Sequence, residues 1–179
     1  GTKTITLKQI HIEEDAGKLV HSRGVSLVDY NRCSVPLVEI VSNPDFRSAE
    51  EVVAYLEKLR ALLTFAGVSD CKMQEGSMRC DVNLSVREAG SDVLGTRTEM
   101  KNMNSLSAIV RAIEYETARH IDAIESGSGD LVQETRRWDD VKRRTFPMRN
   151  KETAADYRYF PDPNLMPIII DDAWLNEIK

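Results

Sequence analysis

The chain has 179 residues, of which 41% are hydrophobic and 30% are charged, and its formal net charge is −5. This composition predicts a globular protein with a hydrophobic core. The net negative charge argues against indiscriminate coating of nucleic acid but leaves room for a local basic surface. The sequence contains no apolar run of roughly 20 residues, the length of a membrane span, and its first residues do not resemble a signal peptide. Because it does not begin with Met, we expect a piece of a longer chain.

The three cysteines, Cys33, Cys71 and Cys80, form no CxxC pair. A disulfide framework or a structural zinc site is therefore not expected, and a reducing cytoplasm is the predicted location. We interpret all three cysteines as ordinary small side chains.

The first predicted strand ends in acids. Segment 4–7 alternates polar and apolar residues, as a strand does, and Glu13, Glu14 and Asp15 stand shortly after it, ahead of a glycine turn. Carboxylate oxygens are the ligands that Mg²⁺ prefers. The acids therefore favour a divalent-cation site, and the alternative is a solvated strand end.

Glu39 lies inside the apolar segment 35–41, which has strand character. An unpaired carboxylate is costly to bury, so this side chain needs a cation, a metal ion or solvent. A simple salt bridge is the alternative to a metal site.

Two helices are predicted. The first runs from Ser48 to Ala66, opens with a capping box of Ser48 and Glu51, and stops at Gly67. The second runs from about Ser105 to Glu125 and stops at Gly127. Apolar residues at helical spacing predict one buried stripe on each: Val52, Tyr55, Leu56, Leu59, Leu62 and Leu63 on the first, and Leu106, Ile109, Val110, Ile113, Ile121 and Ile124 on the second.

Between the helices, segments 79–87 and 95–103 alternate with a period of two, and we expect them to pair as a hairpin. The charged residues of the hairpin share one face: Arg79, Asp81, Asn83, Arg87, Arg97, Glu99 and Lys101. Such a face suits phosphate and metal chemistry, or it is simply exposed to water. The glycine turn in segment 73–77 offers backbone N–H groups to an anion. Strands mixed with helices on one side of an antiparallel sheet predict the α+β class.

Several functional classes are excluded by motif. The sequence has no P-loop GxxxxGK[ST] and no GxGxxG fingerprint. It also has no Ser or Cys nucleophile beside an obvious base. The residues alone thus predict an α+β domain with a metal and phosphate site.

Eight segments in chain order carry a family resemblance: His11–Lys18, Asp29–Arg32, Pro36–Val41, Gly67–Asp70, Met73–Asn83, Glu99–Asn102, Thr135–Asp139 and Asp156–Pro163. Together they resemble the B subunit of the tRNA-dependent amidotransferases and its archaeal relative. The resemblance implies one catalytic domain over residues 1–179, with the N-terminal part and the C-terminal helical and tail regions absent. It also implies a fold like that of glutamine synthetase and the guanido kinases, an antiparallel sheet forming a cradle.

The implied activity is that of a carbon–nitrogen ligase with glutamine as amido donor. ATP and Mg²⁺ phosphorylate the side-chain carboxylate of Glu-tRNA(Gln) or Asp-tRNA(Asn), and ammonia then displaces the phosphate. The resemblance implies a heterotrimer with an amidase (A) subunit and a small C subunit, acting on aminoacyl-tRNA in the cytoplasm without a membrane. The fragment alone is expected to be inactive.

Site residues follow from the same resemblance. Metal ligation falls on Glu14, Glu39 and Glu99, with Glu13 and Asp81 as weaker candidates. Nucleotide or acyl-phosphate contacts are implied for Ser77, Arg79, Asp81 and Lys101, and the catalytic set is Glu14, Glu39, Glu99 and Lys101. Regular strand alternation would place Glu14 and Glu13 on opposite faces. Ser34 stands where family members usually have Gly, so a difference is expected in that turn.

Past a flexible loop at 125–130 the sequence turns basic, and we expect this segment to lie along the acceptor end of tRNA. Its cations are Arg136, Arg137, Lys142, Arg143, Arg144, Arg149 and Lys151. The alternative is a surface loop whose arginines pair with neighbouring acids. Trp138 is assigned a packing role rather than base stacking. Two other functions are weighed: a non-catalytic RNA-binding scaffold, and an ATP-dependent carboxylate–amine ligase for a small molecule.

Overall fold

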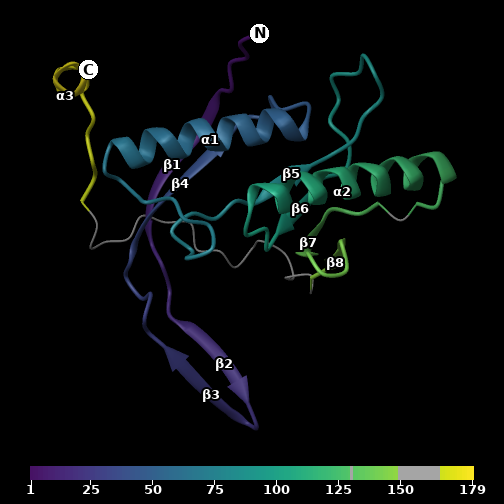
Figure 1. Cartoon of the computed structure of the whole chain (residues 1–179), viewed down its shortest axis with the longest axis horizontal. Coiled ribbons are helices and arrows are strands. Elements are labelled where there is room, and N and C mark those ends of the chain that lie inside the picture. The colour runs from purple at the N-terminus through teal and green to yellow at the C-terminus, as the bar shows by residue number, and fades with distance from the viewer. Residues whose placement is uncertain (130, 149–165) are drawn as a thin grey trace. The chain divides into compact units, whose positions relative to one another are not determined.

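The computed structural model describes residues 1–129, 131–148 and 166–179, in two compact units, Gly1–Met148 and Arg149–Lys179 (Figure 1). In the second unit, α3 (Asp172–Ile178) is capped by Asp171, whose carboxylate accepts the backbone N–H of Trp174 at 2.8 Å. The first unit mixes helices with small sheets, which confirms the α+β class. The implied single catalytic domain and the cradle fold stay predictions.

The elements of the first unit are β1 (Leu7–Glu14), β2 (Lys18–Ser22), β3 (Val25–Asp29), β4 (Pro36–Ser42), α1 (Ala49–Phe65), β5 (Val82–Leu84), β6 (Thr98–Lys101), α2 (Leu106–Ser126), β7 (Glu134–Asp139) and β8 (Arg144–Pro147).

Both predicted helices form where their caps place them. Ser48 accepts the backbone N–H of Glu51 at 3.4 Å at the start of α1, and the Glu51 carboxylate accepts the backbone N–H of Arg47 at 2.7 Å. Ser105 accepts the N–H of Ala108 at the start of α2, and Gly127 ends that helix in the left-handed conformation with φ 63°. No described helix is long and apolar enough to cross a membrane.

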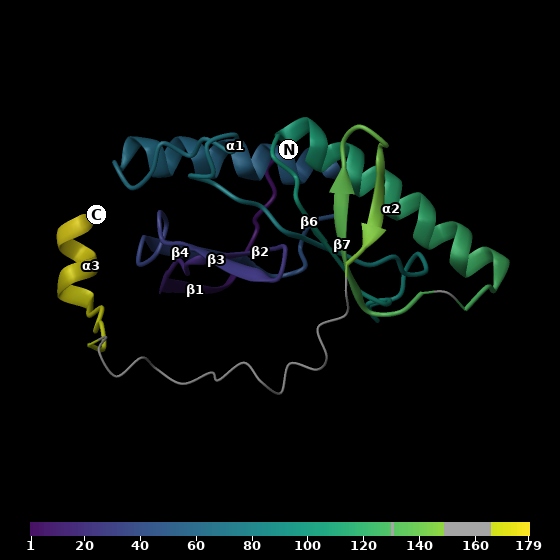
Figure 2. The same cartoon turned by 90° about the horizontal axis from the view of Figure 1, so that it is seen from below.

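A four-stranded sheet with the order β5-β6-β7-β8 lies against α2 (Figures 1 and 2). The predicted hairpin is confirmed, since β5 and β6 pair antiparallel with Asn83 opposite Glu99, although both strands are shorter than predicted. The prediction of a wholly antiparallel sheet was wrong at one pair, because β6 and β7 run parallel. The intervening α2 supplies the crossover connection that parallel strands require.

The core lies between α2, α1 and this sheet, and comprises Leu56, Met100, Met103, Ala108, Ile109, Ala112 and Trp138. The predicted stripe on α2 is confirmed at Ile109 but wrong at Ile121 and Ile124, which are 38% and 52% exposed. On α2 the buried line instead continues from Ala112 to Glu116 and His120, at i, i+4 spacing. A pattern built from apolar residues could not find two polar ones that are buried because their hydrogen bonds are satisfied.

Two further ribbons precede α1. β1 pairs antiparallel with β4, and β2 pairs antiparallel with β3 in a hairpin that extends away from the helices (Figure 1). Every residue of β1, β2 and β3 is exposed within the described chain, including Ile12, Leu19 and Leu27.

Candidate functional site

The face of the four-stranded sheet opposite α2 carries Asn83, Glu99 and Lys101 of the predicted hairpin. On β6, Thr98 and Met100 are buried under α2, so the alternate residues Glu99 and Lys101 project from the opposite face. The parallel register places Thr135 of β7 beside Glu99, and Arg137 beside Lys101. The hairpin therefore contributes its polar face to a surface that continues onto β7.

Lys101 is held between two carboxylates on this face. Its Nζ lies 2.7 Å from Oδ2 of Asp81 and 2.9 Å from Oε1 of Glu99, while the hydroxyl of Thr135 donates to Oε2 of Glu99 at 2.8 Å. Partial burial favours the neutral form of each group, but these hydrogen bonds favour the charged form more strongly. They lower the pKa of Glu99 and raise the pKa of Lys101. Both groups are therefore charged at neutral pH.

Glu39 and Glu14 lie on the β1–β4 ribbon. Glu39 is directly opposite His11, with 3.6 Å between its Oε2 and Nδ1 of the imidazole, and its side chain is 52% exposed. Of the alternatives that the sequence left open for Glu39, the structure shows exposure to solvent beside His11, because neither face of the ribbon is covered within the described chain. Paired residues share a face, so Glu13 lies on the face of Glu39. Glu14, in register with Pro36 at the strand end, lies on the other face.

Arg79 and Ser77 lie in the segment that leads into β5. The guanidinium of Arg79 donates to Oδ2 of Asp15 at 3.0 Å, and Arg32 donates to the same oxygen at 2.8 Å. The hydrogen bond from Arg32 is the main reason that the pKa of Asp15 is lowered. The N–H of Ser77 donates to the carbonyl of Lys72 at 3.1 Å. One of the backbone N–H groups that were predicted to bind an anion is therefore hydrogen-bonded within the turn. The assignment of both residues to nucleotide contacts stays a prediction.

The predicted magnesium ligands have suitable oxygen chemistry but are not brought together. Glu14 and Glu39 lie on opposite faces of one ribbon, and both carboxylate oxygens of Glu99 already accept hydrogen bonds. Within residues 1–129, 131–148 and 166–179, no group of three His, Cys, Asp or Glu side chains is arranged to hold a metal ion. These residues alone do not fit a magnesium site in this arrangement. Ligation by Glu14, Glu39 and Glu99 stays a prediction.

Comparison with known proteins identifies the family. The model of the GatB/GatE catalytic domain matches residues 1–176. This chain belongs to that family. It is 65% identical to the B subunit of the aspartyl/glutamyl-tRNA(Asn/Gln) amidotransferase of Lachnospira eligens and 63% identical to that of Lachnoclostridium phytofermentans, in each case over 99% of the chain. The chain spans 37% of the length of both relatives.

The basic segment of this GatB/GatE domain divides between two faces. Arg136 is turned toward α2, where its Nε lies 3.2 Å from Oε1 of the buried Glu116. Trp138 is 1% exposed and donates its indole N–H to Asp140 at 3.0 Å, which confirms its packing role. Arg137, Lys142 and Arg144 remain exposed. Arg149 and Lys151 lie outside the described residues.

Three contributors to the site were not identified from sequence. Asp15 was identified only as one of three consecutive acids, although its carboxylate forms ion pairs with two arginines. Thr135 and Phe146 were not singled out, because their positions depend on the pairing of β7 with β6 and β8. Short strands carry no local signal of which distant segment they will join.

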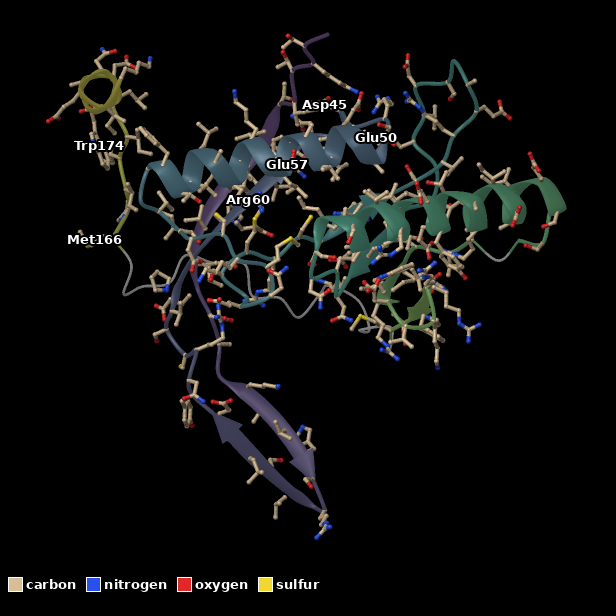
Figure 3. The ribbon with its side chains drawn as sticks, in the orientation of Figure 1. Asp45, Glu50, Glu57, Arg60, Met166 and Trp174 are labelled. Atoms are coloured by element: carbon tan, nitrogen blue, oxygen red, sulfur yellow. The ribbon has the colours of Figure 1, made fainter. Side chains whose placement is uncertain are left out.

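A separate hollow of about 870 Å³ lies between the second half of α1 and the start of α2. Glu57 and Arg60 of α1 (Figure 3), together with Lys72 and Ser105, are among its lining residues. No predicted site residue lines it. The polar face of the sheet, rather than this hollow, is therefore the candidate site of the domain.

Proposed function

We propose that this chain is the part of a tRNA-dependent amidotransferase that activates the side-chain carboxylate of Glu-tRNA(Gln) or Asp-tRNA(Asn) with ATP and then amidates it. The cluster of Asp81, Glu99 and Lys101 carries the proposal. It is supported by the similarity to relatives that are B subunits of aspartyl/glutamyl-tRNA(Asn/Gln) amidotransferases. A partner amidase subunit of a heterotrimer, which also contains a small third subunit, would supply the ammonia.

The reaction needs activation because a carboxylate is a poor electrophile until one oxygen can leave. In the first step a side-chain oxygen of the aminoacyl group bonds to the γ-phosphorus of ATP, and ADP leaves. In the second, the nitrogen of ammonia bonds to the carboxyl carbon, inorganic phosphate leaves with the C–O electron pair, and the nitrogen loses a proton. Negative charge accumulates on phosphoryl oxygens in both steps.

Lys101 is suited to offset that charge. Its ammonium is fixed by two carboxylates, so little reorganisation is needed when a phosphoryl group arrives. Glu99 is less suited to accept the proton from ammonia, because its hydrogen bonds with Lys101 and Thr135 lower its pKa and so weaken it as a base. We therefore assign Glu99 to holding Lys101 in position.

The test is a Lys101→Met variant in the assembled full-length enzyme, assayed with mischarged tRNA, ATP and glutamine. Losing a charge-stabilising contact should lower the rate of ATP-dependent amidation by about 100-fold or more, with glutamine hydrolysis partly retained. Lys58→Met, which removes an exposed cation from α1, is the matched control. Amidation at the normal rate by the Lys101 variant would reject this active face. Amidation of a free small molecule without tRNA would instead favour the small-molecule ligase.

A further inference from the structure

Phe146 of β8 is surrounded by three cations. The guanidinium carbon of Arg144 lies 4.6 Å from the centroid of its ring, Nζ of Lys142 lies 5.1 Å away, and the guanidinium carbon of Arg137 lies 5.4 Å away. All three are within the range of a cation–π contact. The ring is partly buried and the three cations are exposed, so their contacts with the ring hold three positive charges close together at the surface.

In the part of the chain that the structure describes, neither Arg137, Lys142 nor Arg144 forms an ion pair, although Asp139 stands opposite Arg144 in register. The acids next to them in sequence are used elsewhere. Asp139 accepts the backbone N–H groups of residues 141 and 142 at 3.1 and 2.9 Å, and Asp140 accepts from Arg111 and Trp138 at 2.6 and 3.0 Å. Three like charges held together without a direct ion pair form a site that an anion would stabilise.

The cluster lies on the polar face described above. Lys101 is in register with Arg137, and Arg137 is in register with Phe146, so the three residues form one row across β6, β7 and β8. Neighbouring strands are about 4.8 Å apart. The cations around Phe146 are therefore one to two strands from Lys101.

We propose that Arg137, Lys142 and Arg144, gathered on Phe146, bind phosphodiester groups at the single-stranded 3′ end of the aminoacyl-tRNA. The inference rests on the proposed function, because an aminoacyl group presented to Lys101 brings the 3′-terminal phosphates of its tRNA to the same face. Separate phosphates along a flexible strand suit several cations spread around one ring. The contacts position the RNA without reading its bases.

The experiment measures tRNA affinity of the assembled full-length enzyme across a salt series, for wild type and for Arg137→Gln with Arg144→Gln. A cation that meets a single-stranded phosphate contributes about 0.7 to the slope of log affinity against log salt. Removing two should make the slope shallower by about 1.4, equivalent to about 25-fold weaker binding at 0.1 M salt if both proteins bind alike at 1 M. The Arg137→Lys, Arg144→Lys enzyme should keep the wild-type slope.

Two comparisons make the result specific. Lys58→Gln with Arg60→Gln removes the same charge from α1 and should leave the slope unchanged. With a tRNA that lacks its unpaired 3′ nucleotides, wild type and the Arg137/Arg144 variant should bind alike. An unchanged slope, or a difference that persists with the shortened tRNA, would overturn the proposal. A raised KM for ATP with an unchanged slope would assign the cluster to the nucleotide instead. None of these outcomes bears on Lys101, whose variant tests the proposed function separately.

Discussion

The guanidinium of Arg136 lies 3.2 Å from the carboxylate of Glu116, which is completely buried between α2 and the sheet. Glu116 also accepts from Thr145 of β8, and Arg119 pairs with it at 2.8 Å. One carboxylate thus joins α2 to β7 and β8 and fixes the strands whose outer face carries Thr135, Arg137 and the cation cluster. Because Arg136 is engaged here, it is not available to RNA, whereas its neighbour Arg137 is.

Replacing Glu116 with Ala should therefore destabilise the domain strongly. Removing one partner of a buried ion pair typically costs about 3–5 kcal/mol, because the remaining charge is left without compensation. Glu134, 2.7 Å from Arg136, offsets part of that loss, so we expect a value near 3 kcal/mol. Urea unfolding of the full-length subunit measures it. Glu114→Ala, an exposed change on the same helix, should alter stability by less than about 0.5 kcal/mol. Equal effects of the two variants would contradict a supporting role for Glu116.

His120 should make the stability of the domain depend on pH. It is 1% exposed, and burial together with the charge of Arg119 lowers its pKa below the ordinary 6.5, although Glu116 and Glu134 act in the opposite direction and Arg136 adds to the lowering. Arg119 also donates to the hydroxyl of Thr98, which can then donate its own proton to Nε2 of a neutral His120 at 2.9 Å. The folded protein therefore favours the neutral form of His120.

A lowered pKa means that the unfolded chain binds the proton more readily than the folded chain. The stabilisation is complete above the unfolded pKa of about 6.5 and is lost as the pH falls through that value toward the folded pKa. Urea unfolding of the full-length subunit at pH 7.5 and 5.5 should show this loss in wild type and a smaller loss in His120→Gln. His21→Gln, on the exposed β2–β3 hairpin, should behave as wild type. A His120 variant with the wild-type pH dependence would refute the role of this imidazole.

Local signals were sufficient for the helices and for the β5–β6 hairpin. Ser105 and Gly127 mark the ends of α2 through side-chain and backbone preferences that operate within a few residues. Non-local contacts were not predictable. The parallel pairing of β6 with β7 joins two strands that are separated by all of residues 102–133, and the burial of Glu116 depends on partners from two other strands. Likewise, no local pattern could show that Glu39 would face solvent.

The three cysteines should be dispensable for activity. Burial raises the pKa of the Cys80 thiol to about 12, so it is not a nucleophile at neutral pH. Cys71 is 3% exposed, and Cys33 is a free exposed thiol. Replacing all three with Ala in the assembled enzyme should leave both glutamine-dependent and ammonia-dependent amidation largely intact, after melting curves confirm that the protein folds. Selective loss of the glutamine-dependent reaction would show that one of them takes part in ammonia supply.

Glu39, which the family resemblance assigns to the catalytic set, should be needed for the ATP-dependent reaction. Its carboxylate is half exposed and lies beside His11, so the Glu39→Gln change removes a charge without opening a core cavity. We expect ATP-dependent amidation to be abolished and glutamine hydrolysis to be partly retained. Glu57→Gln on α1 is the matched exposed control. Normal amidation by Glu39→Gln, with unchanged Mg²⁺ dependence, would remove Glu39 from the site.

Ser34 should be a position where glycine stabilises the protein. It adopts a left-handed conformation with φ 62°, and its N–H donates to the carbonyl of Asp15 at 2.9 Å, so the chain keeps a turn that suits glycine. A side chain in this conformation costs about 1–2 kcal/mol. Glycine removes that cost, but it also raises the conformational entropy of the unfolded chain. That entropy lowers the stability by about 0.4–1 kcal/mol.

The Ser34→Gly variant should therefore gain about 0.5–1 kcal/mol in the free energy of unfolding of the full-length subunit, within the range expected from these two effects. Ser34→Ala keeps the Cβ atom and should gain nothing. Ser22→Gly, at an extended position in β2, should lose stability, because glycine there adds only unfolded-state entropy. Amidation should be unchanged in the Ser34→Gly enzyme, since the turn still presents Asp15 to Arg32 and Arg79. A loss of stability in Ser34→Gly would mean that the serine side chain contributes more than its backbone conformation costs.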